Sequence, residues 1–149
     1  MIGYFDTSAV VPLVVTEASS ALCAQLWQAC DVRVSSILSI AEAHAALAQA
    51  LRLKRLTEQQ HAAALELLEA RLEELDLISP NRDMVDLAGR MALEHSLRGY
   101  DALHAATALA LQAEDSVAIS GDQDLLAAWR TMGLNVIDVG LPQSTNATA

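Results

Sequence analysis

Residues 2–8 read Ile2-Gly3-Tyr4-Phe5-Asp6-Thr7-Ser8, an apolar run that ends at an acidic residue where a helix-like run begins. The same kind of junction recurs at three later acids, Glu42, Asp101 and Asp122. A parallel α/β fold gathers the carboxyl ends of its strands at one edge of the sheet, and ligands bind in that crevice. Four carboxylates brought together there repel one another unless a divalent cation neutralises their charge. The pattern therefore predicts a metal site lined by hard oxygen ligands.

Strand-like and helix-like runs alternate along the chain, as they do in parallel βα units. The expected strands span residues 2–5, 32–35, 75–78, 117–120 and 135–139. The expected helices span residues 8–15, 19–29, 39–55, 58–74, 83–96, 102–113 and 123–132. Two helices separate the second and third strands, and two more separate the third and fourth. We therefore expect an α/β fold around a short parallel sheet of about five strands.

Residues typical of helix ends agree with these boundaries. Ser39-x-x-Glu42 and Thr57-x-x-Gln60 both have the form of a capping box, in which two side chains satisfy free amide groups at a helix start. Gly133 lies at the expected end of the last helix, where glycine accommodates the turn into the final strand.

Length and composition favour one domain, which we place at residues 1–140 of the 149-residue chain. Residues 141–149 are small and polar, so we expect a disordered tail there. Hydrophobic residues make up 53% of the chain and aromatic residues only 3%, which is typical of a helix-rich core of small and branched side chains. No apolar run approaches the roughly 18 residues of a membrane span, and the N-terminal residues lack the form of a secretory signal. We therefore expect a cytoplasmic protein that does not bind a membrane.

The charge of the chain excludes one way of binding nucleic acid. Nineteen acidic residues stand against nine basic ones, which gives a formal net charge of −10, and Lys54 is the single lysine. Proteins that hold RNA or DNA through a general positive field are usually basic. A phosphate-bearing substrate must therefore be held by a metal and a few arginines, or by a basic partner.

The cysteines and histidines suggest no second site. Cys23 and Cys30 lie seven residues apart on one expected helix, with no Cys-x-x-Cys spacing, so we expect buried thiols rather than zinc or redox chemistry. His104 shares a helix face with Asp101, and we favour a packing or hydrogen-bonding role for it. His44 falls on an apolar face, which favours a core or interface histidine.

Each of the four acids also has an ordinary structural explanation. Asp6, Asp101 and Asp122 could be N-cap or first-turn residues that satisfy free amides at a helix start. Glu42 could close the capping box that begins at Ser39. The two roles are compatible, because the positive end of a helix also helps to keep clustered carboxylates ionised. Four acids at the strand-to-helix junctions of one sheet exceed what capping requires, so we favour the metal site.

Four segments of the chain resemble PIN domains, and more narrowly the small bacterial VapC-like toxins of toxin–antitoxin pairs. They span residues 4–9, 36–42, 100–108 and 119–125, in order along almost the whole chain. The run Tyr100-Asp101-Ala102-Leu103-His104 is the fairly specific part of the resemblance. The resemblance implies a three-layer α/β/α fold and a metal-dependent endoribonuclease. It also implies that water attacks the RNA phosphodiester in line and leaves a 3′-hydroxyl and a 5′-phosphate.

The resemblance further implies roles for individual residues. Asp6 and Asp101 match the acids most directly tied to Mg²⁺ or Mn²⁺, while Glu42 and Asp122 match the remaining two acids of the family's catalytic set. A bound metal can activate water and offset charge on the transition-state oxygens. Ser120 stands where the family often has threonine or serine, and its hydroxyl is expected to support the turn before Asp122. Two further residues are assigned from their positions alone. Asp124 could add a ligand or merely sit in the first turn of its helix, and Arg98 is expected to lie near the substrate.

The resemblance implies partners as well. Such toxins act on RNA, usually form homodimers, and are blocked by a cognate antitoxin whose segment lies in a hydrophobic groove. The apolar helices at residues 9–15 and 21–27 could line that groove or could simply cover the sheet. Two alternatives stay open, a PIN ribonuclease with a housekeeping role in RNA processing and a catalytically silent PIN module that only binds partners. Because no acid of the set is missing, we favour the endoribonuclease toxin.

Overall fold

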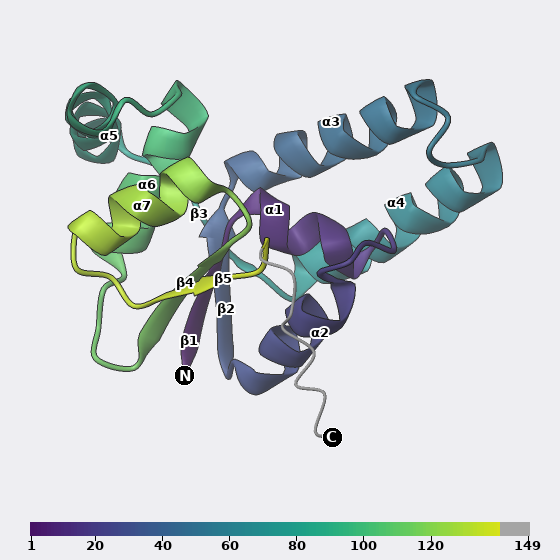
Figure 1. Cartoon of the computed structure of the whole chain (residues 1–149), viewed down its shortest axis with the longest axis horizontal. Coiled ribbons are helices and arrows are strands. Elements are labelled where there is room, and N and C mark those ends of the chain that lie inside the picture. Colours follow the sequence, from purple (N-terminus) through teal and green to yellow (C-terminus); the bar gives the residue numbers. More distant parts are fainter. Residues whose placement is uncertain (141–149) are drawn as a thin grey trace, which may run out of the picture.

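A five-stranded parallel sheet forms the centre of the molecule (Figure 1). The computed structural model describes residues 1–140, and the tail expected at residues 141–149 lies outside them. The strands are β1 (Ile2–Phe5), β2 (Val32–Ser36), β3 (Asp76–Ile78), β4 (Ser116–Ser120) and β5 (Val136–Asp138). Their order across the sheet is β3-β2-β1-β4-β5, and every neighbouring pair is parallel. The predicted parallel sheet is confirmed.

Helices connect successive strands and cover both faces of the sheet. They are α1 (Thr7–Val10), the 3-10 helix η1 (Val11–Leu13), α2 (Ser20–Ala29), α3 (Leu38–Arg52), α4 (Glu58–Glu73), α5 (Arg82–His95), α6 (Gly99–Ala110) and α7 (Gln123–Thr131). Figure 1 shows α1 to α4 on one side of the sheet and α5 to α7 on the other. Within residues 1–140, no helix is long and apolar enough to cross a membrane.

Successive residues of the strands point to opposite faces and build two separate cores. One core lies under α1 to α4 and includes Phe5, Trp27, Leu68 and Ile119. The other lies under α5 to α7 and includes Tyr4, Ala118, Leu125 and Trp129. Two cores on the two faces of one sheet confirm the expected three-layer α/β/α arrangement.

The topology of the sheet places a crevice beside β1. The chain passes from β1 to β2 on one side, whereas β4 pairs with β1 on the other, so the strand order reverses between β1 and β4. Ligands of open α/β sheets bind at such a switch point, beyond the carboxyl ends of the strands. Asp6 directly follows β1 and Asp122 lies just beyond β4, so both acids reach this crevice.

Some helix boundaries differ from the prediction for local reasons. The first expected helix is interrupted, because Pro12 has no amide hydrogen to donate and the chain tightens from α1 into η1. The capping box expected at Ser39 is wrong, since α3 begins one residue earlier and the Ser39 hydroxyl lies 2.6 Å from that of Ser35. The capping box at Thr57 is confirmed. Gly133 follows α7 with a φ of +82°, which confirms the glycine expected at the end of this helix.

The two cysteines and His44 lie outside the crevice. Cys23 and Cys30 are buried free thiols, as expected, although Cys30 follows the end of α2 instead of sharing a helix face with Cys23. The expectation of a core position for His44 is wrong, because its side chain is 38% exposed and its Nε2 lies 3.2 Å from Oε1 of Glu69.

Candidate active site

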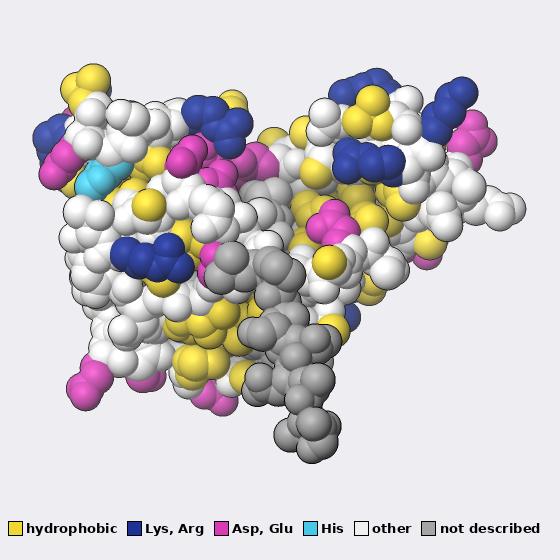
Figure 2. Space-filling view, viewed as in Figure 1, with side chains coloured by type: hydrophobic (Ala, Val, Ile, Leu, Met, Phe, Trp, Pro, Cys, Tyr) yellow, Lys and Arg dark blue, Asp and Glu magenta, His cyan; other side chains and the backbone are white. Residues whose placement is uncertain are grey.

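The four acids at the strand-to-helix junctions line one open cavity of about 750 Å³. They come from four separate parts of the chain: Asp6 beyond β1, Glu42 in α3, Asp101 in α6 and Asp122 beyond β4. Figure 2 shows acidic side chains gathered beneath a basic one between α3 and the helices α5 to α7. The fold thus brings together all four acids that the sequence singled out.

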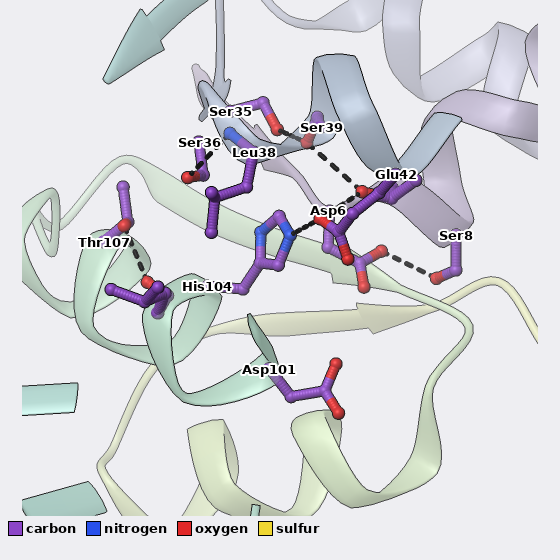
Figure 3. Close-up of polar contacts among 12 residues, drawn as sticks. Asp6, Ser8, Ser35, Ser36, Leu38, Ser39, Glu42, Asp101, His104 and Thr107 are labelled. Carbon is purple, nitrogen blue, oxygen red and sulfur yellow. Dashed lines mark hydrogen bonds and ion pairs between the residues drawn. The ribbon is translucent and has the colours of Figure 1, made fainter. Parts of the chain in front are cut away.

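Asp6 is the buried member of this set, with 5% of its surface exposed. It stands at the N-cap position of α1, yet its side chain makes no cap hydrogen bond, so capping does not explain its presence. Its Oδ1 accepts a 2.6 Å hydrogen bond from the Ser8 hydroxyl (Figure 3). Burial raises the pKa of Asp6 to about 6, although nearby His104 and Ser8 act in the opposite direction. A cation beside this carboxylate would favour its ionised form.

Glu42 is fixed in place by a buried imidazole. Its Oε1 accepts a 2.6 Å hydrogen bond from His104 Nε2 and a 2.9 Å bond from the Thr7 hydroxyl. His104 is only 1% exposed, and its Nδ1 lies 2.7 Å from the hydroxyl oxygen of Tyr4. Figure 3 shows the imidazole pointing from α6 toward the Glu42 carboxylate. The hydrogen-bonding role expected for His104 is thereby confirmed, and its partner across the crevice is an acid of the predicted set.

The His104–Glu42 contact joins two charged groups. Burial acts to raise the pKa of Glu42, but the hydrogen bond and the charge of His104 outweigh burial and lower that pKa. Burial likewise opposes the charged form of His104, yet the hydrogen bond to Glu42 and the Asp6 carboxylate raise its pKa above the ordinary value. Both shifts favour an imidazolium paired with a carboxylate.

Arg98 spans the remaining two acids. Its Nε lies 2.8 Å from Oδ2 of Asp101, and its Nη2 lies 3.7 Å from Oδ2 of Asp122. The hydrogen bond to Asp101 raises the pKa of Arg98. Asp122 also caps α7, because its Oδ1 accepts hydrogen bonds from the amides of Asp124 and Leu125. One oxygen of Asp122 therefore serves the helix, while the other faces Arg98 across the cavity.

Hydroxyl groups tie the two strand ends together behind the acids. Ser120 is fully buried, its hydroxyl accepts a 2.9 Å hydrogen bond from the Asp122 amide, and it lies 3.3 Å from the Ser8 hydroxyl. Ser8 in turn accepts a 2.7 Å bond from the Gly121 amide while donating to Asp6. Sequence reasoning did not assign Ser8, and its position two residues after Asp6 is the signal that could have identified it.

Asp124 takes no part in this arrangement through its side chain. It is exposed in the first turn of α7, and it is absent from the described residues that line the cavity. Of the two uses expected for it, the position in a first helical turn is the one observed.

The donors around the cavity fit a hard divalent cation in their chemistry. Carboxylate oxygens are the ligands that Mg²⁺ and Mn²⁺ prefer, and buried Asp6 makes no ion pair within residues 1–140. Within residues 1–140, no three Asp, Glu, His or Cys side chains lie close enough together to hold one metal ion. Arg98 engages Asp101 and Asp122 instead, so a cation at these acids would compete with the guanidinium.

Comparison with known proteins identifies the family. Residues 3–128 match the PIN domain family. The chain belongs to the PIN-domain family. This PIN domain is 38% identical over 133 residues to a Mycobacterium tuberculosis protein named Ribonuclease VapC45, covering 89% of the present chain and 92% of that relative. The family resemblance predicted from the sequence is confirmed.

Solved structures share the fold of this PIN domain. PAE2754 from Pyrobaculum aerophilum superimposes with a TM-score of 0.71 at 27% identity, covering 94% of this chain and 93% of the other. VapBC-5 from M. tuberculosis, a member of the VapBC family of toxin–antitoxin systems, gives a TM-score of 0.60 at 20% identity, covering 92% and 98%. Both likenesses agree with the three-layer arrangement of the sheet and helices.

Proposed function

We propose that this PIN domain is a metal-dependent endoribonuclease that acts as the toxin of a toxin–antitoxin pair. The observation that carries the proposal is Asp6, a carboxylate that is buried without an ion pair among the described residues and shares its cavity with three other acids. A buried carboxylate without an ion pair, beside other acids, is expected where a cation binds. The similarity to a relative named as a ribonuclease supports RNA as the substrate.

Four carboxylates would hold the metal, Mg²⁺ or Mn²⁺: Asp6, Glu42, Asp101 and Asp122. When bound, the ion supplies an activated water and offsets charge on the phosphate oxygens. Ser8 fixes the Asp6 carboxylate through its 2.6 Å hydrogen bond, and His104 fixes Glu42 through Nε2. Asp6 and Glu42 are thus each oriented by a hydrogen-bonding partner, which is how proteins fix the ligands of metal sites.

Arg98 is the group of this chain best placed to meet the RNA phosphate. Its side chain is 82% exposed at the mouth of the cavity, where it pairs with Asp101 and Asp122. An exposed guanidinium can turn from carboxylates to a phosphate without loss of buried contacts, and its fork matches phosphate oxygens. With a metal held by these two acids, Arg98 would be free for this contact.

The test is cleavage of total cellular RNA by purified, antitoxin-free protein with Mg²⁺, Mn²⁺ or EDTA. Discrete fragments that require metal, and that disappear in Asp6→Asn and Asp101→Asn, are the expected result. Asp115→Asn is the matched control, since it removes the same charge from an exposed residue away from the cavity. Absence of both cleavage and metal binding in the unmodified protein would refute the enzyme and favour a silent interaction module.

A groove beside the acids supports the antitoxin as a partner. An opening of about 570 Å³ lies between η1, α3 and α4, and its apolar lining includes Val11, Val14, Val15, Leu47 and Leu56. Val11, Ala46 and Gln49 line both this groove and the cavity of the acids. A protein segment in the groove can therefore extend to the carboxylates, where a basic side chain would meet four acids. Of the two segments expected to line such a groove, residues 9–15 contribute Val11, Val14 and Val15, whereas residues 21–27 are not among its lining residues.

Two neighbouring residues of α4 allow a sharp test of this groove. Ala63 is exposed and lines the groove, whereas Ala62 is exposed on the same helix without lining it. We expect Ala63→Asp to remove inhibition by the antitoxin encoded beside this gene while RNA cleavage persists, and Ala62→Asp to remain inhibited. Equal inhibition of both variants would place the antitoxin elsewhere. The absence of any adjacent antitoxin gene would favour a housekeeping ribonuclease. The homodimer and the cytoplasmic location stay predictions, for which sedimentation and cell fractionation are the direct measurements.

A further inference from the structure

A second cavity of about 520 Å³ opens beside the acids, between α5 and α6. It shares four of its lining residues with the cavity of the acids: Glu42, Arg98, Tyr100 and Asp101. A ligand whose phosphate lies at the acids can therefore extend directly into this side cavity. Its volume lies within the range of about 300 to 1,000 Å³ that is usual for small organic ligands.

Small residues keep the side cavity empty. Five small residues line this cavity: Ala88, Gly89 and Ala92 from α5, and Gly99 and Ala102 from α6. A Cβ atom added at Gly89 or Gly99 would meet no atom within 4 Å, and neither glycine has a positive φ. Glycine inside a helix costs roughly 0.5–1 kcal/mol relative to alanine, so Gly89 weakens α5 with no conformational need. Its effect is to leave the cavity open.

Planar groups stand at the mouth of the side cavity. Tyr100 is 62% exposed there, whereas the other four aromatic residues of the chain are all buried: Tyr4, Phe5, Trp27 and Trp129. The guanidinium of Arg98 lies at the same mouth. Unstacked RNA bases are typically held on aromatic rings or on arginine planes. The position of this aromatic ring therefore suits a base that has left the RNA stack.

The charge of the chain favours such a contact. A net charge of −10 attracts no RNA through a general field, so affinity has to come from local contacts. Stacking of one base on an aromatic ring is worth about 1–3 kcal/mol and does not depend on charge.

We propose that the side cavity receives a nucleobase of the RNA, unstacked from the nucleotide whose 5′-phosphate lies at the acids. This inference rests on the proposed ribonuclease function. Tyr100 stacks on the base, and the small residues of α5 and α6 enclose it. Because the base must leave any helix to enter, the substrate is single-stranded at the cleaved position. The mainly apolar walls enclose the base by shape and stacking.

The test uses nucleoside monophosphates as probes, since they carry a base and a 5′-phosphate. Binding of adenosine 5′-monophosphate and uridine 5′-monophosphate is measured by calorimetry with Mg²⁺, beside ribose 5-phosphate, which lacks the base. We expect at least one nucleotide to bind more tightly than ribose 5-phosphate, by roughly 5- to 150-fold. Gly89→Leu, which fills the cavity, and Tyr100→Ala should both remove this difference. Tyr100→Phe should retain it, because the ring is preserved.

Controls separate this inference from the function on which it rests. Ala127→Leu adds three carbons, one fewer than Gly89→Leu, at an exposed position of α7 and should leave nucleotide binding unchanged. If all phosphates bind with Mg²⁺ but the base adds nothing, the side cavity is not a base site while the metal-dependent function stands. If no probe shows Mg²⁺-dependent binding, the proposed function fails as well. A change in oligomeric state caused by Gly89→Leu would overturn the inference in favour of a subunit interface.

Discussion

Replacing Asp6 by asparagine should make the metal-free protein more stable, although it removes a residue of the active site. The Asp6 carboxyl is buried, and burial raises its pKa from 3.8 to about 6. Below pH 3.8 the carboxyl is protonated in both the folded and the unfolded chain and does not affect stability. Above pH 3.8 the unfolded chain ionises first, which favours unfolding until the folded form also ionises near pH 6. Stability is therefore lost as the pH rises through this window.

The size of the effect follows from the two pKa values. The gap between 3.8 and about 6 corresponds to about 3 kcal/mol of unfolding free energy above pH 6. Asparagine keeps an oxygen that accepts the Ser8 hydrogen bond and carries no charge, so it avoids this cost. We expect Asp6→Asn to raise the unfolding free energy by about 3 kcal/mol at pH 8 in EDTA, with little gain near pH 4.

Urea denaturation of both proteins at pH 4 and pH 8 measures this difference. Asp115→Asn removes the same charge from an exposed position and should change stability little at either pH. Mg²⁺ at about 100 times its dissociation constant should stabilise the unmodified protein by about 2.7 kcal/mol and leave Asp6→Asn unchanged. A variant that is no more stable than the unmodified protein at pH 8 would refute the argument that burial of the Asp6 charge destabilises the folded protein.

Three further substitutions test features of the fold around the site. Tyr4→Phe removes the buried partner of His104 Nδ1, so urea denaturation should show a loss of about 1–3 kcal/mol, and RNA cleavage should fall as Glu42 loses its fixed position. Unchanged stability would mean that this contact contributes nothing. Thr57→Ala removes the confirmed capping box of α4 and should lower the unfolding free energy by about 1 kcal/mol, while cleavage stays the same. Gly133→Ala should cost about 1–2 kcal/mol by thermal unfolding, because φ is +82° there, and a neutral result would contradict the strained turn.

Local sequence patterns sufficed to predict the strands and the chain segments that carry the acids. The alternation of apolar strand-like runs with helical spacing is a local property, and it predicted β1 with its observed bounds. Local patterns also misled where two signals competed. Ser39 has the residues of a capping box, but its hydroxyl lies 2.6 Å from the hydroxyl of Ser35 in β2. Pro12 was a visible signal that the first helix would not continue to residue 15.

The contacts that orient the acids could not be predicted from the sequence. Tyr4 and His104 are 100 residues apart in the chain, and His104 and Glu42 are 62 apart, so their meeting depends on the register of the sheet and the packing of α6 against it. The same holds for Arg98, whose neighbour Asp101 is local but whose second partner, Asp122, arrives from the far side of β4. The side cavity depends on how closely α5 and α6 approach each other, which their sequences do not specify.

The pairing of β1 with β4 has a consequence for a nuclease made on a ribosome. Ser8 and Ser120 meet behind the acids although 112 residues separate them, and Asp122 comes later still. Because a domain folds as a unit, a chain that stops before Asp122 lacks both the pairing of β1 with β4 and the fourth acid. Under the proposed function, such a shortened chain should therefore not cleave RNA.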